Sequence, residues 1–116
     1  MQKLIESIVG AIADKKGKNI CSLDLTALEG TICDAFVVCN ADSTTQVAAI
    51  ADSVYERVLT DLGEKPAHIE GAQNALWIAM DYGNVIVHIF QSELRDFYRL
   101  EQLWADAKTT RFASEE

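Results

Sequence analysis

Two groups of residues in this chain have side chains of the kinds used in catalysis, a histidine–glutamate pair and the cysteines. His68 and Glu70 match the H-x-E half of the zinc deaminase signature, in which the histidine binds zinc and the glutamate transfers protons. The sequence lacks the P-C-x-x-C half, which supplies the other zinc ligands. Residues spaced by two on an extended segment share one face of a strand. We therefore interpret the pair as neighbours on a strand and not as a zinc site.

A nucleophilic cysteine is the second possibility, and it would need a histidine close by in space. Cys33 and Cys39 adjoin apolar runs, where a cysteine usually acts as a small core residue. Together with Cys21 they form no C-x-x-C pair and their number is odd, so we expect thiols in a reducing compartment. The sequence also has no P-loop, G-x-G-x-x-G or G-x-S-x-G motif. We predict no catalytic residue, cofactor or metal, with a thiol hydrolase built on Cys33 or Cys39 as the alternative.

A predicted β-hairpin between residues 76 and 90 carries the best evidence for binding. Two apolar runs flank Gly83, which can adopt the positive φ of a tight turn. With Tyr82–Gly83 as a two-residue loop, Trp77 would face His88. Side chains alternate along a strand, so one face would be core and the other a mixture of apolar and polar groups, as in a protein-binding patch. The core face would hold Leu76, Ile78, Met80, Val85, Val87 and Ile89, and the mixed face Trp77, Ala79, Asp81, Asn84, Ile86, His88 and Phe90.

The first predicted element that precedes this hairpin in the sequence is a helix. Apolar residues recur at helical spacing over residues 2–16, and Gly17 follows as a helix end. Apolar and polar residues alternate over residues 19–25, which predicts a strand with one face exposed to solvent. Residues 35–39 form a continuous apolar run, which is typical of a strand covered on both faces.

The clearest helix follows, with Ser43 as its N-cap and Gln46 three residues later in a capping-box pattern. It ends at Leu62–Gly63. A short strand over residues 67–70 leads to the hairpin, and Ser92 can begin a last helix. The order α-β-β-α-β-β-β-α predicts an α/β or mixed α+β fold, with a single mixed sheet of about five strands and flanking helices. We predict one domain over residues 1–107 and a flexible tail over residues 108–116.

Charge and hydropathy restrict the partners. The chain has 18 Asp and Glu residues against 10 Lys and Arg, a formal net charge of −8 at pH 7. Direct DNA binding depends on clustered basic residues, so we expect none, and a basic partner is favoured instead. No apolar run approaches the roughly 20 residues that span a bilayer. The first residues also lack a basic leader, so we expect a cytoplasmic protein without a membrane contact.

The C-terminal third carries a distinctive pattern. W-x-x-x-D-x-G-N-V-I-V-H spans Trp77–His88, and R-x-F-Y-x-L-E-x-L-W spans Arg95–Trp104. Both segments closely resemble the ribosomal silencing factor family, RsfS or Iojap, and the likeness extends from the first helix to about Ala107. The chain departs from the family pattern at Ala35, at Asn40–Ala41–Asp42 and at Thr45, so no role is assigned to this strand-to-helix loop.

The resemblance implies a nucleotidyltransferase-like fold without retained transferase activity. It also implies binding to a large-subunit ribosomal protein, L-fourteen, at the intersubunit face. The bound protein would block small-subunit joining by steric exclusion and so repress translation when nutrients are scarce. A small nucleotidyltransferase-fold enzyme and a homodimeric interaction module are the alternatives. The resemblance leaves contact with ribosomal RNA open.

We predict a partner-binding surface built on aromatic anchors, because such anchors within a polar rim are typical of binding hot spots. His88 could instead be a structural histidine packed on the indole. The last helix could also fold back and cover Trp77 in an ordinary aromatic cluster. The predicted surface consists of Trp77, Asp81, Tyr82, Tyr98, Leu100 and Trp104, with His88 and Arg95 at its rim.

Overall fold

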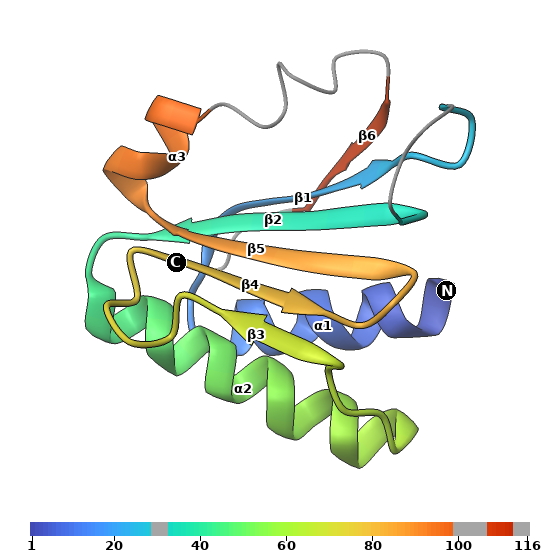
Figure 1. The fold of residues 1–116 in the computed structure, drawn as a ribbon, viewed down its shortest axis with the longest axis horizontal. Coiled ribbons are helices and arrows are strands. Elements are labelled where there is room, and N and C mark those ends of the chain that lie inside the picture. Colours follow the sequence, from blue (N-terminus) through green and yellow to red (C-terminus); the bar gives the residue numbers. More distant parts are fainter. Residues whose placement is uncertain (29–32, 99–106, 113–116) are drawn as a thin grey trace.

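A single mixed β-sheet organises the chain, as the sequence predicts, with six strands in the order β3-β4-β5-β2-β1-β6. The computed structural model describes residues 1–28, 33–98 and 107–112, with the backbone alone for 96–98. Figure 1 shows α1 and α2 on one side of the sheet and α3 on the other. The elements are α1 (Gln2–Asp14), β1 (Lys18–Asp24), β2 (Ala35–Ala41), α2 (Thr44–Leu62), β3 (His68–Glu70), β4 (Trp77–Asp81), β5 (Val85–Gln91), α3 (Ser92–Tyr98) and β6 (Lys108–Arg111).

The central strand β2 is buried along its whole length, which confirms the strand predicted to be covered on both faces. Val37 and Cys39 belong to the core beneath α1 and α2, whereas Phe36 and Val38 belong to a second core on the opposite face. β2 runs parallel to β5 and antiparallel to β1. The carboxyl ends of β2 and β5 therefore meet at one edge of the sheet.

Helix α2 begins and ends as predicted. The Ser43 hydroxyl accepts a hydrogen bond from the Gln46 amide at 3.1 Å, and Gly63 ends the helix in the left-handed conformation at φ +67°. The second half of the predicted capping box is wrong. The Gln46 side chain instead donates to the carbonyls of Lys15 and Lys16, which ties the start of α2 to the end of α1. None of the helices in the described ranges is both long and apolar enough to cross a bilayer.

The hairpin forms, but its turn lies one residue later than predicted. The Tyr82 amide donates to the Val85 carbonyl at 2.9 Å, so Gly83–Asn84 is the loop, and Gly83 has φ +90°. The Asp81 carboxylate accepts from the Gly83 amide at 2.7 Å, which favours this turn over the predicted one. Trp77 therefore pairs with Phe90 and not with His88. The shift in pairing is an even number of residues, so the side chains of β4 and β5 keep their predicted faces.

Two other predictions are wrong. Leu76 is 42% exposed and not part of the core, because it follows a turn at Ala75 (φ +56°) and precedes β4. The expected flexible tail contains a sixth strand, since Lys108–Arg111 pairs antiparallel with β1. This strand is exposed throughout and is held by backbone pairing, so no apolar alternation in the sequence indicates it.

Candidate functional site

The sheet face opposite α1 and α2 carries a mixed surface at the end formed by β3, β4 and β5. The strand register places alternate residues of all three strands on this side, and we call them the outer sheet face. Its centre is half-exposed, its floor is buried, and its rim is exposed. The centre consists of Trp77, Ala79, Asp81 and Ile86, the floor of His88 and Phe90, and the rim of His68 and Glu70.

Among the described residues, His88 and Phe90 fix the Trp77 indole within this face. Its Nε1–H donates to Nδ1 of His88 at 3.1 Å. Its rings stack on Phe90 with a centroid distance of 4.9 Å and an interplanar angle of 27°. The polar atom of the indole is thus satisfied within the chain. What the half-exposed ring offers a partner is apolar surface in a fixed orientation.

His88 is a structural residue beneath the indole, so its predicted position at the rim is wrong. It is 8% exposed, and Phe36 packs edge-on against its ring at a centroid distance of 4.7 Å. Burial lowers the pKa of His88 to about 4, so the ring is neutral near pH 7. Because Nδ1 accepts from the indole, we assign the proton to Nε2, which is buried and has no hydrogen-bond partner among the described residues.

Tyr82 lies on the opposite face of the sheet from Trp77, which the sequence prediction missed. It is 8% exposed and belongs to the core beneath the helices. Burial, followed by the nearby Tyr55 and Glu64, raises the pKa of its phenol to about 12. Tyr82 therefore supports the hairpin from below and cannot share one contact patch with the Trp77 ring.

Arg95 is also buried, at 8% exposure, so its predicted place at a rim is wrong. α3 starts directly after β5 and turns the guanidinium back over β1 and β2. There it donates to the Asn19 carbonyl and, at 3.0 Å, to Oδ1 of Asn40. Its second terminal nitrogen lies 3.5 Å from Sγ of Cys21.

The remaining predicted site residues divide into two groups. Asp81 is half-exposed on the outer sheet face and faces His68 across the β3–β4 pair. Leu100 and Trp104 lie outside the described residues, as does the side chain of Tyr98. Their place in a partner surface stays a prediction. His68 and Glu70 were not among the predicted surface residues, although their spacing of two indicated that they share one face of the strand.

The residues that could have supported catalysis have ordinary structural environments. His68 and Glu70 are strand neighbours, as interpreted, and their side chains contact each other. The Cys33 and Cys39 side chains are buried, and burial raises the pKa of both thiols, that of Cys39 to about 12. A raised pKa disfavours the nucleophilic thiolate. Within residues 1–28, 33–98 and 107–112, no three His, Cys, Asp or Glu side chains are grouped to hold a metal ion.

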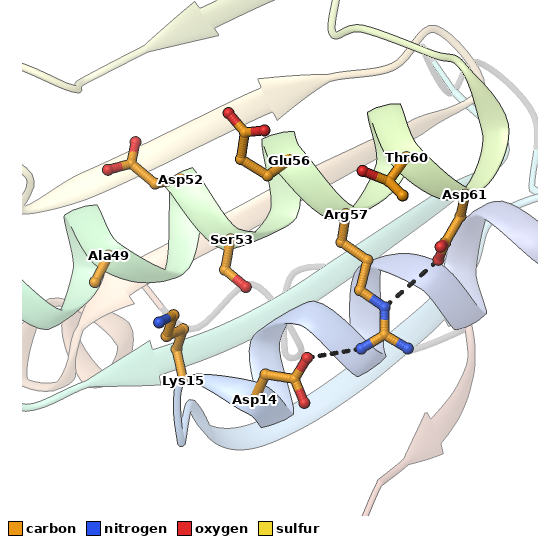
Figure 2. Close-up of a pocket in the computed structure, with 9 residues that line it drawn as sticks. All are labelled: Asp14, Lys15, Ala49, Asp52, Ser53, Glu56, Arg57, Thr60 and Asp61. Carbon is orange, nitrogen blue, oxygen red and sulfur yellow. Dashed lines mark hydrogen bonds and ion pairs between the residues drawn. The ribbon is translucent and has the colours of Figure 1, made fainter.

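A charged groove of about 690 Å³ lies between α1 and α2, away from the outer sheet face. Figure 2 shows Arg57 reaching from α2 toward α1, with ion pairs to Asp14 at 2.8 Å and to Asp61 at 3.4 Å. The guanidinium lies over Gly10, where an added Cβ would sit 2.8 Å from it. Arg57 thus joins the two helices, and the groove holds none of the predicted site residues.

Three comparisons with known proteins bear on this site. The model of the family "Ribosomal silencing factor during starvation" matches residues 1–116. The ribosomal silencing factor RsfS of Halalkalibacterium halodurans is 36% identical over 108 residues, which are 93% of this chain and 91% of the relative. A mouse protein named for mitochondrial assembly of the ribosomal large subunit is 26% identical over 86% of this chain and 44% of its own length. A crystal structure from Chromobacterium violaceum superposes with a TM-score of 0.84 at 32% identity, covering 98% of this chain and 93% of that one.

Proposed function

This chain belongs to the ribosomal silencing factor family, and from that we propose that it represses translation without catalysis by binding the large ribosomal subunit at the intersubunit face. Ribosomal protein L-fourteen is the proposed partner, and nutrient limitation is the proposed condition. The observation that supports this function best is the outer sheet face. Its centre on the hairpin is mainly apolar, and the carboxylates of Asp81 and Glu70 lie beside Trp77.

The outer sheet face has the chemistry of a docking site for a basic protein. A fixed, half-exposed tryptophan at its centre is the kind of residue that dominates binding energy in protein interfaces. Glu70 and Asp81 beside it add negative charge to a chain whose formal net charge is already −8. Ribosomal proteins that bind RNA are generally basic, so complementary fields would speed encounter and fix orientation.

The proposed mechanism is steric exclusion. The chain measures 35 × 33 × 27 Å along its principal axes. A body of this size on the intersubunit face would occupy space that the small subunit must enter. Repression would then need tight binding at the right place and no chemical step, which agrees with the buried, high-pKa thiols of Cys33 and Cys39.

Co-sedimentation with purified large subunits tests this proposal. Trp77→Ala should weaken binding roughly 30- to 1,000-fold, the usual loss for a central aromatic anchor of about 2–4 kcal/mol. Trp77→Phe, which keeps a ring on Phe90, should lose less. Ile69→Ala is the matched control, because Ile69 is 40% exposed but lies on the helix side of the sheet.

The proposal fails if folded Trp77→Ala binds like the parent chain, or if Ile69→Ala weakens binding equally. Capture of purified L-fourteen by the parent chain, but not by folded Trp77→Ala, would identify the partner. The homodimer suggested by the family resemblance stays a prediction, which light scattering across a range of protein concentrations would test.

A further inference from the structure

A polar cavity of about 510 Å³ lies where the carboxyl ends of β2 and β5 meet. Asn40 and Asp42 lie at the end of β2, and Ser92 and Arg95 follow β5. In open α/β sheets, small ligands bind in the crevice outside the carboxyl ends of the strands. We call the space lined by Lys18, Asn40, Asp42, Ser92, Arg95 and Arg111, together with Asn19, the polar cavity.

The charge of the polar cavity is opposite to that of the chain. Among the described residues that line it are three cations, Lys18, Arg95 and Arg111, and one carboxylate, Asp42. Asp42 is already engaged, since it lies 2.6 Å from Nζ of Lys18 and accepts from the Ser92 hydroxyl at 2.9 Å. The pair with Asp42 offsets the charge of Lys18, so the described lining has two cations in excess, Arg95 and Arg111, on a chain of formal charge −8.

Buried polar groups hold this lining in a fixed geometry. Asn40 is 4% exposed and Arg95 8% exposed. The Asn40 amide donates to the Ser92 hydroxyl at 2.8 Å, while its oxygen accepts from Arg95 at 3.0 Å and from the Asn19 amide at 3.1 Å. Such a connected network fixes its members, so the guanidinium is oriented before any ligand arrives.

The backbone of β1 is bent to complete the network. The pairing of β1 with β2 changes register between Lys18 and Cys21, and Asn19 within this bulge has φ +53°. In this conformation the Asn19 carbonyl accepts from Arg95 and its side chain reaches Asn40. Bulges that re-aim side chains are frequent next to binding and active sites.

We propose that the polar cavity binds the phosphate group of a small phosphorylated ligand of nucleotide size. Arginine provides the planar donors that phosphate recognition favours, and the volume lies within the roughly 300–1,000 Å³ of small-molecule sites. Arg111 and Lys18 stand at the exposed side, with Arg95 in the wall. The site is separate from the outer sheet face, so it does not depend on the proposed ribosome binding. The backbone of RNA is the other source of a phosphate group that this cavity would bind.

Titration of the full chain, followed by amide NMR and calorimetry, tests this site. The probes are ATP without divalent metal, inorganic phosphate, and a short single-stranded RNA without a terminal phosphate. We expect ATP to bind more tightly than inorganic phosphate and to shift the amide resonances of Asn19, Asn40 and Ser92. Binding of the RNA at these resonances without binding of ATP would assign the phosphate to a polynucleotide.

Arg111→Gln should weaken binding about 10- to 100-fold, the effect of one lost charge-assisted contact. Lys108→Gln is the matched control, because Lys108 lies on the same strand β6 but lines a different cavity beside Asp24. Lys18→Gln is the second variant should Arg111→Gln fail to fold. The proposal is overturned if no probe shifts these resonances, or if the cavity variants and Lys108→Gln bind equally well.

Discussion

The outer sheet face is mainly apolar around Trp77, with the carboxylates of Asp81 and Glu70 beside it, whereas the described lining of the polar cavity carries an excess of cations and includes the buried Asn40 and Arg95. Both are built on the same sheet. The first gathers residues of β3, β4 and β5, which follow one another in the chain and in the sheet. The second gathers residues of β1, β2, α3 and β6, which are as far apart in the sequence as Lys18 and Arg111.

The two regions are stabilised by different interactions. Among the described residues, the outer sheet face is held by ring packing around Trp77 and by the hydrogen bond from its indole to His88. The polar cavity is held by a connected network around Asn40, in which Asn40 and Arg95 are buried. Substitutions in the outer sheet face should therefore mainly weaken the proposed partner binding, whereas substitutions in the network of the polar cavity should mainly lower the free energy of unfolding.

Asn40→Leu should have the largest effect on stability. It removes the partner of Arg95, Asn19 and Ser92 at once and leaves a buried guanidinium without one of its acceptors. We expect the free energy of unfolding to fall by about 3–5 kcal/mol in urea denaturation. Ser92→Ala is the control, since it removes only part of the network and should cost about 1 kcal/mol. Equal losses for the two variants would show that Asn40 is not the centre of the network.

His88 should make folding stability depend on pH. Its pKa is lowered from 6.5 to about 4 by burial, so between these values the unfolded chain binds a proton that the folded chain does not. Stability is therefore complete above about pH 6.5 and falls by up to about 3 kcal/mol as the pH drops toward 4. Urea unfolding at several pH values should show this loss for the parent chain and not for His88→Gln, which keeps an acceptor for the indole. His68→Gln, at the exposed histidine, should follow the parent chain, and parallel curves for all three would contradict the assignment.

Sequence reasoning succeeded where a local pattern decides the structure. The alternation in residues 76–90 placed every hairpin side chain of β4 and β5 on its correct face, although the turn was assigned one residue early. The contact of Trp77 with His88 was also anticipated, because neighbours on one face stay close after an even shift in register. The two caps of α2 at Ser43 and Gly63 were equally local.

Sequence reasoning failed where distant segments meet. Arg95 belongs to a motif whose pattern suggested an exposed rim, but its partners Asn19 and Asn40 lie 76 and 55 residues away. Strand β6 has no apolar alternation, because backbone pairing to β1 holds it. Tyr82 was counted as a loop residue and grouped with Trp77 in the predicted surface, whereas its amide closes the turn and its side chain is buried on the helix side of the sheet.

The smallest effect we expect is on the rate of ribosome binding, and it tests whether the acidic rim acts by charge alone. Glu70→Gln keeps the size of the side chain and removes one negative charge beside Trp77. Rim charges mainly steer encounter, so the association rate with large subunits should fall about two- to fivefold at low salt, with little change in dissociation. Glu56→Gln removes the same charge from the groove between α1 and α2, on the helix side of the molecule (Figure 2), and should leave the rate nearly unchanged. Stopped-flow measurements in 50 mM and 300 mM salt would distinguish the two variants. A rate that falls equally for both would mean that net charge, and not the rim of the outer sheet face, guides the encounter.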